Sequence, residues 1–248
     1  MFARLSSSSM RYVRNAAFAA LSVAVLSTAA SASTITIVNG GFETTTFGGG
    51  QLGYNTDVTG WSTTGYNFVY TGVASATTGV SGQYGNVALW TTASFVASPN
   101  GGNFLALDGA YGQGALTQTI SGFNTGDKVT INFSFAGAQQ QGFDGENTEQ
   151  FMVSLGGQDL YTEVLKNHSH GFTGWKSESL TFTATSSSEV LSFFAIGTPA
   201  GVPPMSLLDG VSATSNTVSA VPEPSSIALM MTGFASLGGY VRSRVKKS

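Results

Sequence analysis

The sequence lacks cysteine and is poor in charged residues. None of its 248 residues is a cysteine, which excludes disulfides, a thiolate nucleophile, Fe–S clusters and cysteine-ligated zinc. Asp, Glu, Lys and Arg make up only 9% of the chain, whereas 42% is hydrophobic and 32 residues are glycine. An exported protein of this kind would depend on its apolar core for stability. The composition favours a turn-rich, all-β protein with a weakly charged surface.

Basic residues are scarce in the body of the chain. Seven of the ten lie in the two terminal segments, which leaves Lys128, Lys166 and Lys176. Twelve acidic residues lie between Glu43 and Asp209, so the body has a formal charge of about −9. Binding nucleic acid requires a basic surface that neutralises phosphates. We therefore predict no nucleic-acid partner.

No apolar run reaches the ~20 residues that a membrane-spanning helix takes. Near the N-terminus, a positive segment contains Arg4, Arg11 and Arg14. An apolar run of eleven residues, 16–26, follows it, and Ala30–Ala32 then provides small residues for cleavage. This order predicts a helical secretory signal peptide over residues 1–32, with the mature chain starting at Ser33. The alternative is an N-terminal membrane anchor, for which the run is short.

From Thr34 onward the pattern changes to short β-like runs between Gly, Asn, Asp and Ser. In residues 128–135, apolar side chains occupy every second position, as in a half-buried antiparallel strand. Eleven candidate strands follow from such runs: residues 34–38, 66–70, 87–91, 104–107, 115–120, 128–136, 150–155, 160–165, 178–184, 190–196 and 207–213. We predict an all-β fold over residues 33–220: a two-sheet antiparallel β-sandwich of jelly-roll type.

Short motifs occur in a characteristic order along the body: Asn39–Glu43, Gly60-Trp61, Ala106–Gly109, Leu116–Ile120, Gly174-Trp175 and Leu207–Val211. This series resembles the galactose-binding-like jelly rolls, which include carbohydrate-binding modules. The resemblance implies that the first and last strands are neighbours. It also implies a structural calcium ion, held by Glu43 and Asp209 with backbone carbonyls. The alternative is that Glu43 caps a turn and Asp209 closes one.

Other polar clusters give weaker indications. His168 and His170 lie in an Asn-, Ser- and Gly-rich segment that predicts an exposed loop, and without a nearby acid they make an incomplete metal site. Asp144, Glu146 and Glu149 could serve glycoside hydrolysis only at a specific separation and with one raised pKa. A solvated acidic loop or a second calcium site is the alternative. Because no Gly-x-Ser-x-Gly elbow is present either, we predict that the protein is not an enzyme.

The three tryptophans, with the eight tyrosines, could form a sugar-stacking platform, because flat aromatic rings pack on the apolar faces of sugars. Trp61 and Trp175, each preceded by glycine, are expected in the core, whereas Trp90 could face either way. The tryptophans therefore predict no defined sugar site.

The C-terminal 28 residues have three parts. Pro222 and Pro224 keep the first part extended. An apolar run over residues 227–241 then predicts a transmembrane helix at about 225–241. Fifteen helical residues span only about 22 Å, less than the ~30 Å hydrocarbon core. A basic end over residues 242–248 predicts a cytoplasmic C-terminus.

This order resembles the PEP-CTERM sorting signal of Gram-negative bacteria over residues 221–248. The matching residues are the motif Val221, Pro222, Glu223 and Pro224 and the basic residues Arg242, Arg244, Lys246 and Lys247. The resemblance implies recognition and processing by an exosortase, transient membrane anchoring and delivery to the cell envelope or an extracellular matrix. We expect the sandwich to bind extracellular polysaccharide. The alternatives are a structural or adhesive protein without a specific ligand, and a glycan-active hydrolase.

Overall fold

The structure, a computed structural model, describes residues 32–216 except residue 93. The predicted signal peptide, apart from Ala32, and the predicted sorting signal lie outside these residues. Within the described range, no helix is both long and apolar enough to cross a bilayer. The single helix in that range, α1 (Val73–Thr78), has six residues.

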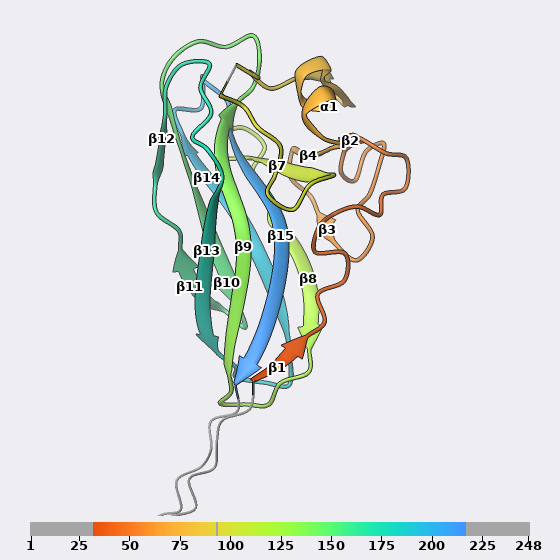
Figure 1. Cartoon of the computed structure of the whole chain (residues 1–248), viewed down its shortest axis with the longest axis vertical. Coiled ribbons are helices and arrows are strands. Elements are labelled where there is room, and N and C mark those ends of the chain that lie inside the picture. Colours follow the sequence, from red (N-terminus) through yellow and green to blue (C-terminus); the bar gives the residue numbers. More distant parts are fainter. Residues whose placement is uncertain (1–31, 93, 217–248) are drawn as a thin grey trace, which may run out of the picture.

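Two antiparallel sheets form a sandwich (Figure 1). The seven-stranded sheet consists of β13 (Lys176–Thr183), β9 (Lys128–Gln139), β15 (Pro204–Asn216), β7 (Phe104–Asp108), β4 (Asn67–Tyr70) and β2 (Gly50–Gln51), in that order, with β1 (Ala32–Ile35) beside β15. The six-stranded sheet consists of β11 (Gln158–Tyr161), β10 (Asn147–Leu155), β14 (Ser188–Thr198), β8 (Leu116–Ser121) and β3 (Ser62–Thr63), with β12 (Leu165–Asn167) beside β10. A separate hairpin joins β5 (Val80–Gly82) to β6 (Gly85–Val87).

The chain passes repeatedly from one sheet to the other. Strands β7, β9, β13 and β15 belong to the larger sheet, whereas β8, β10 and β14 belong to the smaller one. This alternation confirms the predicted all-β, two-sheet sandwich of jelly-roll type. β1 pairs with the end of β15, with Ala32 opposite Asn216, so the first and last described strands are neighbours, as expected.

Three of the predicted strands differ from the structure. The run 34–38 is strand only to Ile35, where β1 ends. Strand 87–91 is wrong beyond Val87, where β6 ends, because the apolar side chains that follow are buried in a loop. The run 160–165 is split into β11 and β12. At the break, the hydroxyl of Thr162 accepts a hydrogen bond from the Phe151 backbone N–H at 3.0 Å. This side chain takes the place of the backbone carbonyl that would accept the bond in a regular sheet.

The core has two parts. The main cluster fills the space between the sheets, and the predicted inward residues of β9, from Val129 to Phe135, all belong to it. The second cluster includes Ala136 and Ala138 of β9, and α1, β5 and β6 contribute to it. The far half of β9 is therefore buried on both faces, and its alternation of exposed and buried residues ends at Ser134.

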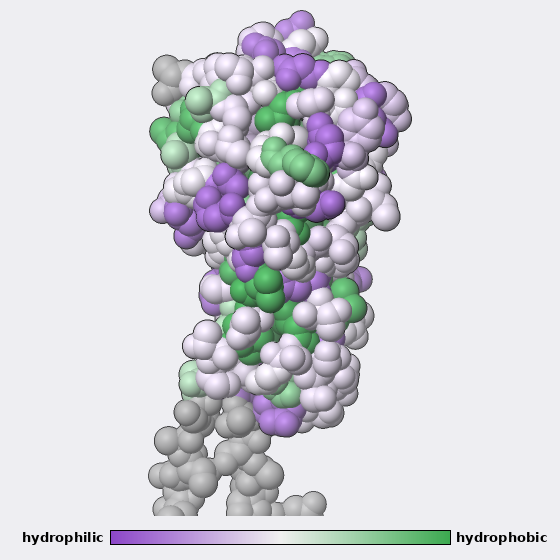
Figure 2. All heavy atoms as spheres, turned by 90° about the vertical axis from the view of Figure 1, so that its right-hand side faces the viewer, coloured by the Kyte–Doolittle hydropathy of each residue, from purple (hydrophilic) through white to green (hydrophobic). Residues whose placement is uncertain are grey.

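The surface is weakly polar. Figure 2 shows hydrophobic residues in separate groups among weakly hydrophilic ones on the side that faces right in Figure 1. The start of β1 and the end of β15, where Ala32 pairs with Asn216, lie at the bottom of Figure 1, whereas β2 and β4 lie in the opposite half. Both ends of the described chain thus leave the sandwich at the same pole.

Candidate functional site: a tyrosine-lined pocket

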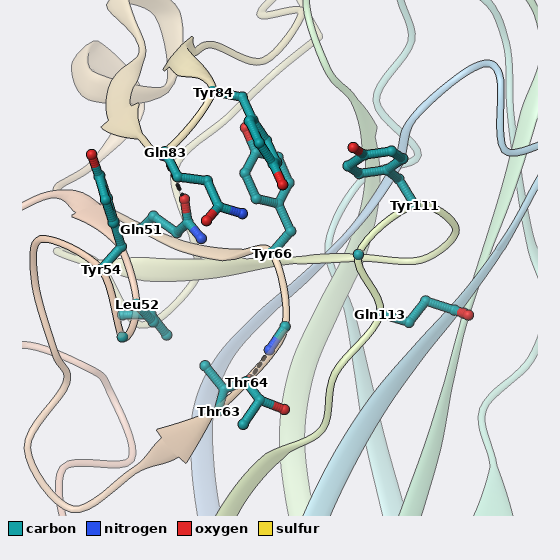
Figure 3. Close-up of a pocket in the computed structure, with 13 residues that line it drawn as sticks. Gln51, Leu52, Tyr54, Thr63, Thr64, Tyr66, Gln83, Tyr84, Tyr111 and Gln113 are labelled. Atoms are coloured by element: carbon teal, nitrogen blue, oxygen red, sulfur yellow. Dashed lines mark hydrogen bonds between the residues drawn. The ribbon is translucent and has the colours of Figure 1, made fainter.

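Three loops of the sandwich surround an open pocket of about 560 Å³ (Figure 3). The loops are the turn after β2, the β5–β6 turn and the β7–β8 loop, together with the residues that precede β4. The side chains that line the pocket are uncharged: Gln51, Leu52, Tyr54, Thr63, Thr64, Tyr66, Gln83, Tyr84, Tyr111 and Gln113. This is an aromatic and amide surface without a formal charge.

Three tyrosine rings gather on one side of the pocket. The ring centroid of Tyr66 lies 5.5 Å from that of Tyr84 and 6.3 Å from that of Tyr111, and Tyr84 and Tyr111 are 6.2 Å apart. Tyr66 is 7% exposed, whereas Tyr84 and Tyr111 are 67% and 68% exposed. Large exposed rings are costly to leave in water unless a partner covers them. Tyr66 thus forms a buried base for two rings that are open to a ligand.

A buried carboxylate shapes the loop that carries Tyr111. Asp108, at the end of β7, is 2% exposed. Its Oδ1 accepts hydrogen bonds from the backbone N–H groups of Ala110 and Tyr111 at 2.9 and 3.0 Å, and its Oδ2 accepts one from Gly112 at 3.0 Å. Three charge-assisted bonds from consecutive residues fix the turn. The Tyr66 N–H then donates to the Gly112 carbonyl at 2.6 Å, which ties this loop to the base of the pocket.

A buried amide positions the loop that carries Tyr84. Gln51 is 5% exposed, and its Oε1 accepts a hydrogen bond from the Gln83 N–H at 2.8 Å (Figure 3). Gly82 is required nearby, because a Cβ there would stand 2.8 Å from the ring of Phe68. The hairpin tip therefore packs directly on the sheet. Both exposed tyrosines project from loops that buried polar side chains hold in place.

The phenol at the base of the pocket, Tyr66, stays protonated at neutral pH. Burial raises the pKa of Tyr66 above its ordinary value, and the nearby charge of Asp108 raises this pKa further. A neutral phenol both donates and accepts hydrogen bonds, as the glutamine and threonine side chains beside it also can. Flat rings next to neutral hydrogen-bonding groups suit a ligand with apolar faces and many hydroxyl groups.

The sequence indicates tyrosines as part of a possible sugar-stacking platform, but it singles out none of the four that line the pocket. Each pocket tyrosine is adjacent to a glycine, as in Gly53-Tyr54, Gly65-Tyr66, Tyr84-Gly85 and Tyr111-Gly112, and all except Tyr66, which begins the predicted strand 66–70, lie in predicted loops. Aromatic residues in glycine-rich loops are exposed more often than those in strands, so this signal was available. The sequence does not show that the loops carrying these tyrosines, which are up to 57 residues apart, converge on one pocket.

Two of the three tryptophans, Trp61 and Trp175, pack in the core as expected. Trp61 is 6% exposed and packs on Phe42 in the main core. Trp175 is half-buried, and its ring lies 5.8 Å from Phe104 in the second cluster. Trp90, which could have faced either way, is half-buried with its ring 4.0 Å from that of His170. None of the three lines the tyrosine pocket.

The two histidines lie in a loop, as predicted, but the expectation that they lack a nearby acid is wrong. His168 Nδ1 lies 3.1 Å from Glu146 Oε1, and His170 Nε2 lies 2.5 Å from Asp144 Oδ1. The pairs join the β9–β10 loop to the β12–β13 loop, which are distant in sequence and therefore could not be matched from it. Among residues 32–92 and 94–216, no three His, Asp or Glu side chains are grouped to hold a metal ion.

The acidic residues of segment 144–149 are separated by the fold. The side chains of Asp144 and Glu146 are 85% and 79% exposed and contact the histidines, whereas Glu149 is 1% exposed within β10. Burial raises the pKa of Glu149 to about 8, and a hydrogen bond from Asn167 opposes the shift. The solvated loop therefore includes only the first two acids. The segment does not present paired carboxylates to one substrate space, as glycoside hydrolysis requires.

The fold brings Glu43 and Asp209 close together. A Cβ at Gly41 would lie 3.9 Å both from Asp209 Oδ1 and from Glu43 Cγ. Asp209 lies in the bulge of β15, is fully buried, and accepts hydrogen bonds from the Ser98 hydroxyl and from the Gly210 N–H. Burial raises the pKa of Asp209 to about 6, and the charge of Glu43 also raises it.

This geometry agrees with both interpretations of the pair. Glu43 Oε1 accepts a hydrogen bond from the Asn103 N–H at 2.9 Å, which is the turn-capping role. Two adjacent carboxylates, neither of which forms an ion pair with a basic side chain in the described residues, also suit a divalent cation. A calcium ion there would supply charge neutralisation, and Glu43 and Asp209 would hold it.

Residues 220–245 match the PEP-CTERM protein-sorting motif. The structure is similar to TmCBM61, solved in complex with β-1,4-galactotriose, at a TM-score of 0.41 and 15% identity, covering 73% of this chain and 98% of that one. It is also similar to the CBM22-1 xylan-binding domain of Paenibacillus barcinonensis Xyn10C. The TM-score is 0.35 and the sequence identity 14%, and the match covers 69% of this chain and 94% of that domain. A search of curated proteins found no match.

Another similar structure is the K3 cleaved adhesin domain of Lys-gingipain from Porphyromonas gingivalis. Its TM-score is 0.38 at 12% identity, covering 74% of this chain and 99% of that domain. The fold and the sorting motif together define a class: a jelly-roll β-sandwich protein with a C-terminal PEP-CTERM sorting motif. More particularly, the PEP-CTERM motif indicates sorting by an exosortase to the cell envelope or surface.

Proposed function

We propose that this protein binds a neutral extracellular polysaccharide through the tyrosine pocket. The observation that carries the proposal is the pair of exposed rings, Tyr84 and Tyr111, on the buried base of Tyr66. Sugar rings have apolar faces that pack on aromatic rings, and their hydroxyl groups would meet the neutral amides and hydroxyls of the lining. The pocket is open rather than enclosed, which suits an internal stretch of a long chain.

The charge of the body favours neutral sugars over acidic ones. The lining has no basic side chain to pair with a uronate or sulfate group. The surrounding domain has a formal charge of about −9, which repels polyanions at low ionic strength. Neutral glycans are therefore expected to bind, with little dependence on salt.

The test is binding of the exported protein to an array of neutral and acidic polysaccharides. We expect Tyr84→Ala and Tyr111→Ala each to weaken binding of the best neutral glycan about tenfold, because a stacked ring contributes on the order of 1 kcal/mol or more. Tyr161→Ala is the matched control, since Tyr161 is 54% exposed on β11 and does not line the pocket. An array without binding would favour the structural or adhesive alternative.

We propose in addition that Glu43 and Asp209 hold a structural calcium ion. The support is the buried, closely spaced pair of carboxylates described above. Calcium would stabilise the bulge of β15 and the loop after β1 against each other, without direct contact with sugar. If so, calcium raises the melting temperature and Asp209→Asn removes that increase; an unchanged melting temperature in the wild type leaves the turn-closing interpretation.

We also propose that an exosortase cleaves near Val221–Pro224 and releases the sandwich to the envelope or matrix. The support is the match of residues 220–245 to the sorting motif, together with the short apolar run that follows the Pro-Glu-Pro sequence. Before cleavage the tail would anchor the protein in the inner membrane. Glu223→Ala should then leave the full-length precursor in the membrane fraction.

A further inference from the structure

One end of the space between the sheets is polar rather than hydrophobic. Inward positions near the ends of β9, β10 and β15 are taken by Gln139, Asn147, Glu149 and Ser206, which are 0%, 3%, 1% and 1% exposed. Further along the same strands, the inward positions belong to phenylalanine, valine and leucine. A sandwich core gains nothing in stability from uncompensated polar groups. Their concentration at one end needs a physical cause.

The register places these side chains against one another. Gly137 of β9 pairs with Ser206 of β15, so both face the space between the sheets. A Cβ at Gly137 would overlap with Oε2 of Glu149, which shows that this carboxylate crosses from the smaller sheet to the larger one. Gly137 therefore provides the room for the carboxylate. Asn147 lies two residues before Glu149 on β10 and faces the same way.

Several polar atoms in this region lack a hydrogen-bond partner in the described chain. They are Oε2 of Glu149, Oδ1 and Nδ2 of Asn147, and the hydroxyl of Ser206. Oε1 of Glu149 receives only a long bond, 3.4 Å, from Asn167 Nδ2. Native proteins satisfy nearly all buried polar groups, because each unsatisfied one costs about 1–3 kcal/mol. Unsatisfied atoms on three neighbouring side chains indicate a common partner.

The chemistry of these atoms indicates what the partner is. A carboxylate oxygen, an amide oxygen and a hydroxyl oxygen are the ligands that hard cations prefer. No basic side chain forms an ion pair with Glu149 in the part of the chain that the structure describes. A cation would neutralise the buried carboxylate and bind the amide and hydroxyl oxygens at the same time.

The cluster lies behind the smaller sheet as seen from outside. A hollow of about 370 Å³ lies on the outer face of that sheet, between β10, β12 and the end of β14. Thr148, Lys166 and Thr198 share this outer face. Asn147 pairs with Asn167, and both are almost fully buried on the opposite face, toward the space between the sheets.

We propose that Glu149, Asn147 and Ser206 form an internal site for a hard metal cation. The site is separate from the Glu43–Asp209 pair, which lies at the bulge of β15. It has one charged ligand, so a singly charged ion such as Na⁺ leaves the interior neutral, whereas Ca²⁺ or Mg²⁺ binds more strongly to the carboxylate but leaves a positive charge.

The test is thermal melting of the exported protein, stripped of metal and kept at about pH 8 in choline chloride. Na⁺, Mg²⁺ and Ca²⁺ are added in separate titrations. The variant Glu43→Gln/Asp209→Asn is the background, so that a shift there cannot come from that carboxylate pair. We expect at least one cation to raise the melting temperature by about 5 °C at saturation.

Two variants in that background decide whether the shift belongs to this site. Glu149→Gln keeps the size of the side chain and removes its charge, and it should abolish the cation-dependent rise. Ser206→Ala removes one oxygen and should raise the cation concentration at half-saturation about tenfold or more. The proposal is overturned if no cation shifts melting in the background variant. It is equally overturned if Glu149→Gln retains the full shift.

Discussion

At the scale of single residues, the buried carboxyl group of Glu149 links structure to pH. The carboxyl ionises near 4.5 when exposed, whereas burial raises its pKa to about 8 in the folded protein. Between these values the folded protein binds a proton that the unfolded chain has released. The free energy of unfolding therefore decreases as the pH rises through this window, by up to about 1.4 kcal/mol for each pH unit.

We predict that Glu149→Gln removes this pH dependence. In chelator and choline chloride, the wild-type protein should lose stability between about pH 6.5 and pH 8, while the variant stays nearly constant. Asp209 contributes little in this range, because burial raises its pKa only to about 6. Urea unfolding at several pH values measures the effect. Parallel curves for the two proteins would show that Glu149 is not the group responsible.

The roles of single residues were harder to predict from the sequence than the strands were. Trp61 was correctly expected in the core because apolar surface is the main force that buries a residue. Tyr84 and Tyr111 were missed because their role depends on which loops meet in space, and this is decided by strand order. Likewise, Glu149 and Glu146 are only three residues apart, yet strand register buries one and exposes the other.

At the scale of elements, long strands were predictable and short ones were not. β9 and β14 alternate over many residues, so their existence followed from period-2 hydrophobicity. β2 and β3 have two residues each, too few for any periodic pattern. These short strands frame the tyrosine pocket. The scaffold could thus be inferred from the sequence, whereas the loops that carry the candidate site could not.

The β7–β8 loop offers a test of how an element presents a binding residue. Asp108→Asn removes the negative charge that three backbone N–H groups share, without touching a ring of the pocket. We predict a loss of about 1–3 kcal/mol in stability and faster amide hydrogen exchange in residues 109–113. Glycan binding should weaken several-fold because Tyr111 is less well fixed.

The control for this prediction is Asp159→Asn, since Asp159 lies on the exposed strand β11, away from the pocket. That change should leave binding and exchange in the β7–β8 loop unaltered. If Asp108→Asn binds glycan as tightly as the wild type, the loop does not need this carboxylate to present Tyr111.

At the scale of the whole molecule, the pairing of β1 with β15 places both ends of the described chain at one end of the sandwich. Ala32 is opposite Asn216, so the chain enters and leaves the sandwich at one pole. β2, which contributes Gln51 to the pocket, and β4, which directly follows Tyr66, lie in the opposite half of the molecule (Figure 1). A tail that anchors the protein at the first pole would therefore leave the pocket directed away from the membrane surface.

This arrangement predicts that sorting and binding are separable. Deletion of residues 221–248 removes the sorting motif but no residue of the described sheets, because β15 ends at Asn216. The truncated protein should keep the melting temperature and the glycan affinity of the wild type, while it moves from the membrane and envelope fractions to the soluble exported fraction. Cell fractionation with melting and array measurements on the same samples tests both halves. A truncated protein that melts at a lower temperature or binds less glycan would mean that the tail contributes to the folded domain, since its removal would then cost contacts beyond those that end at Asn216.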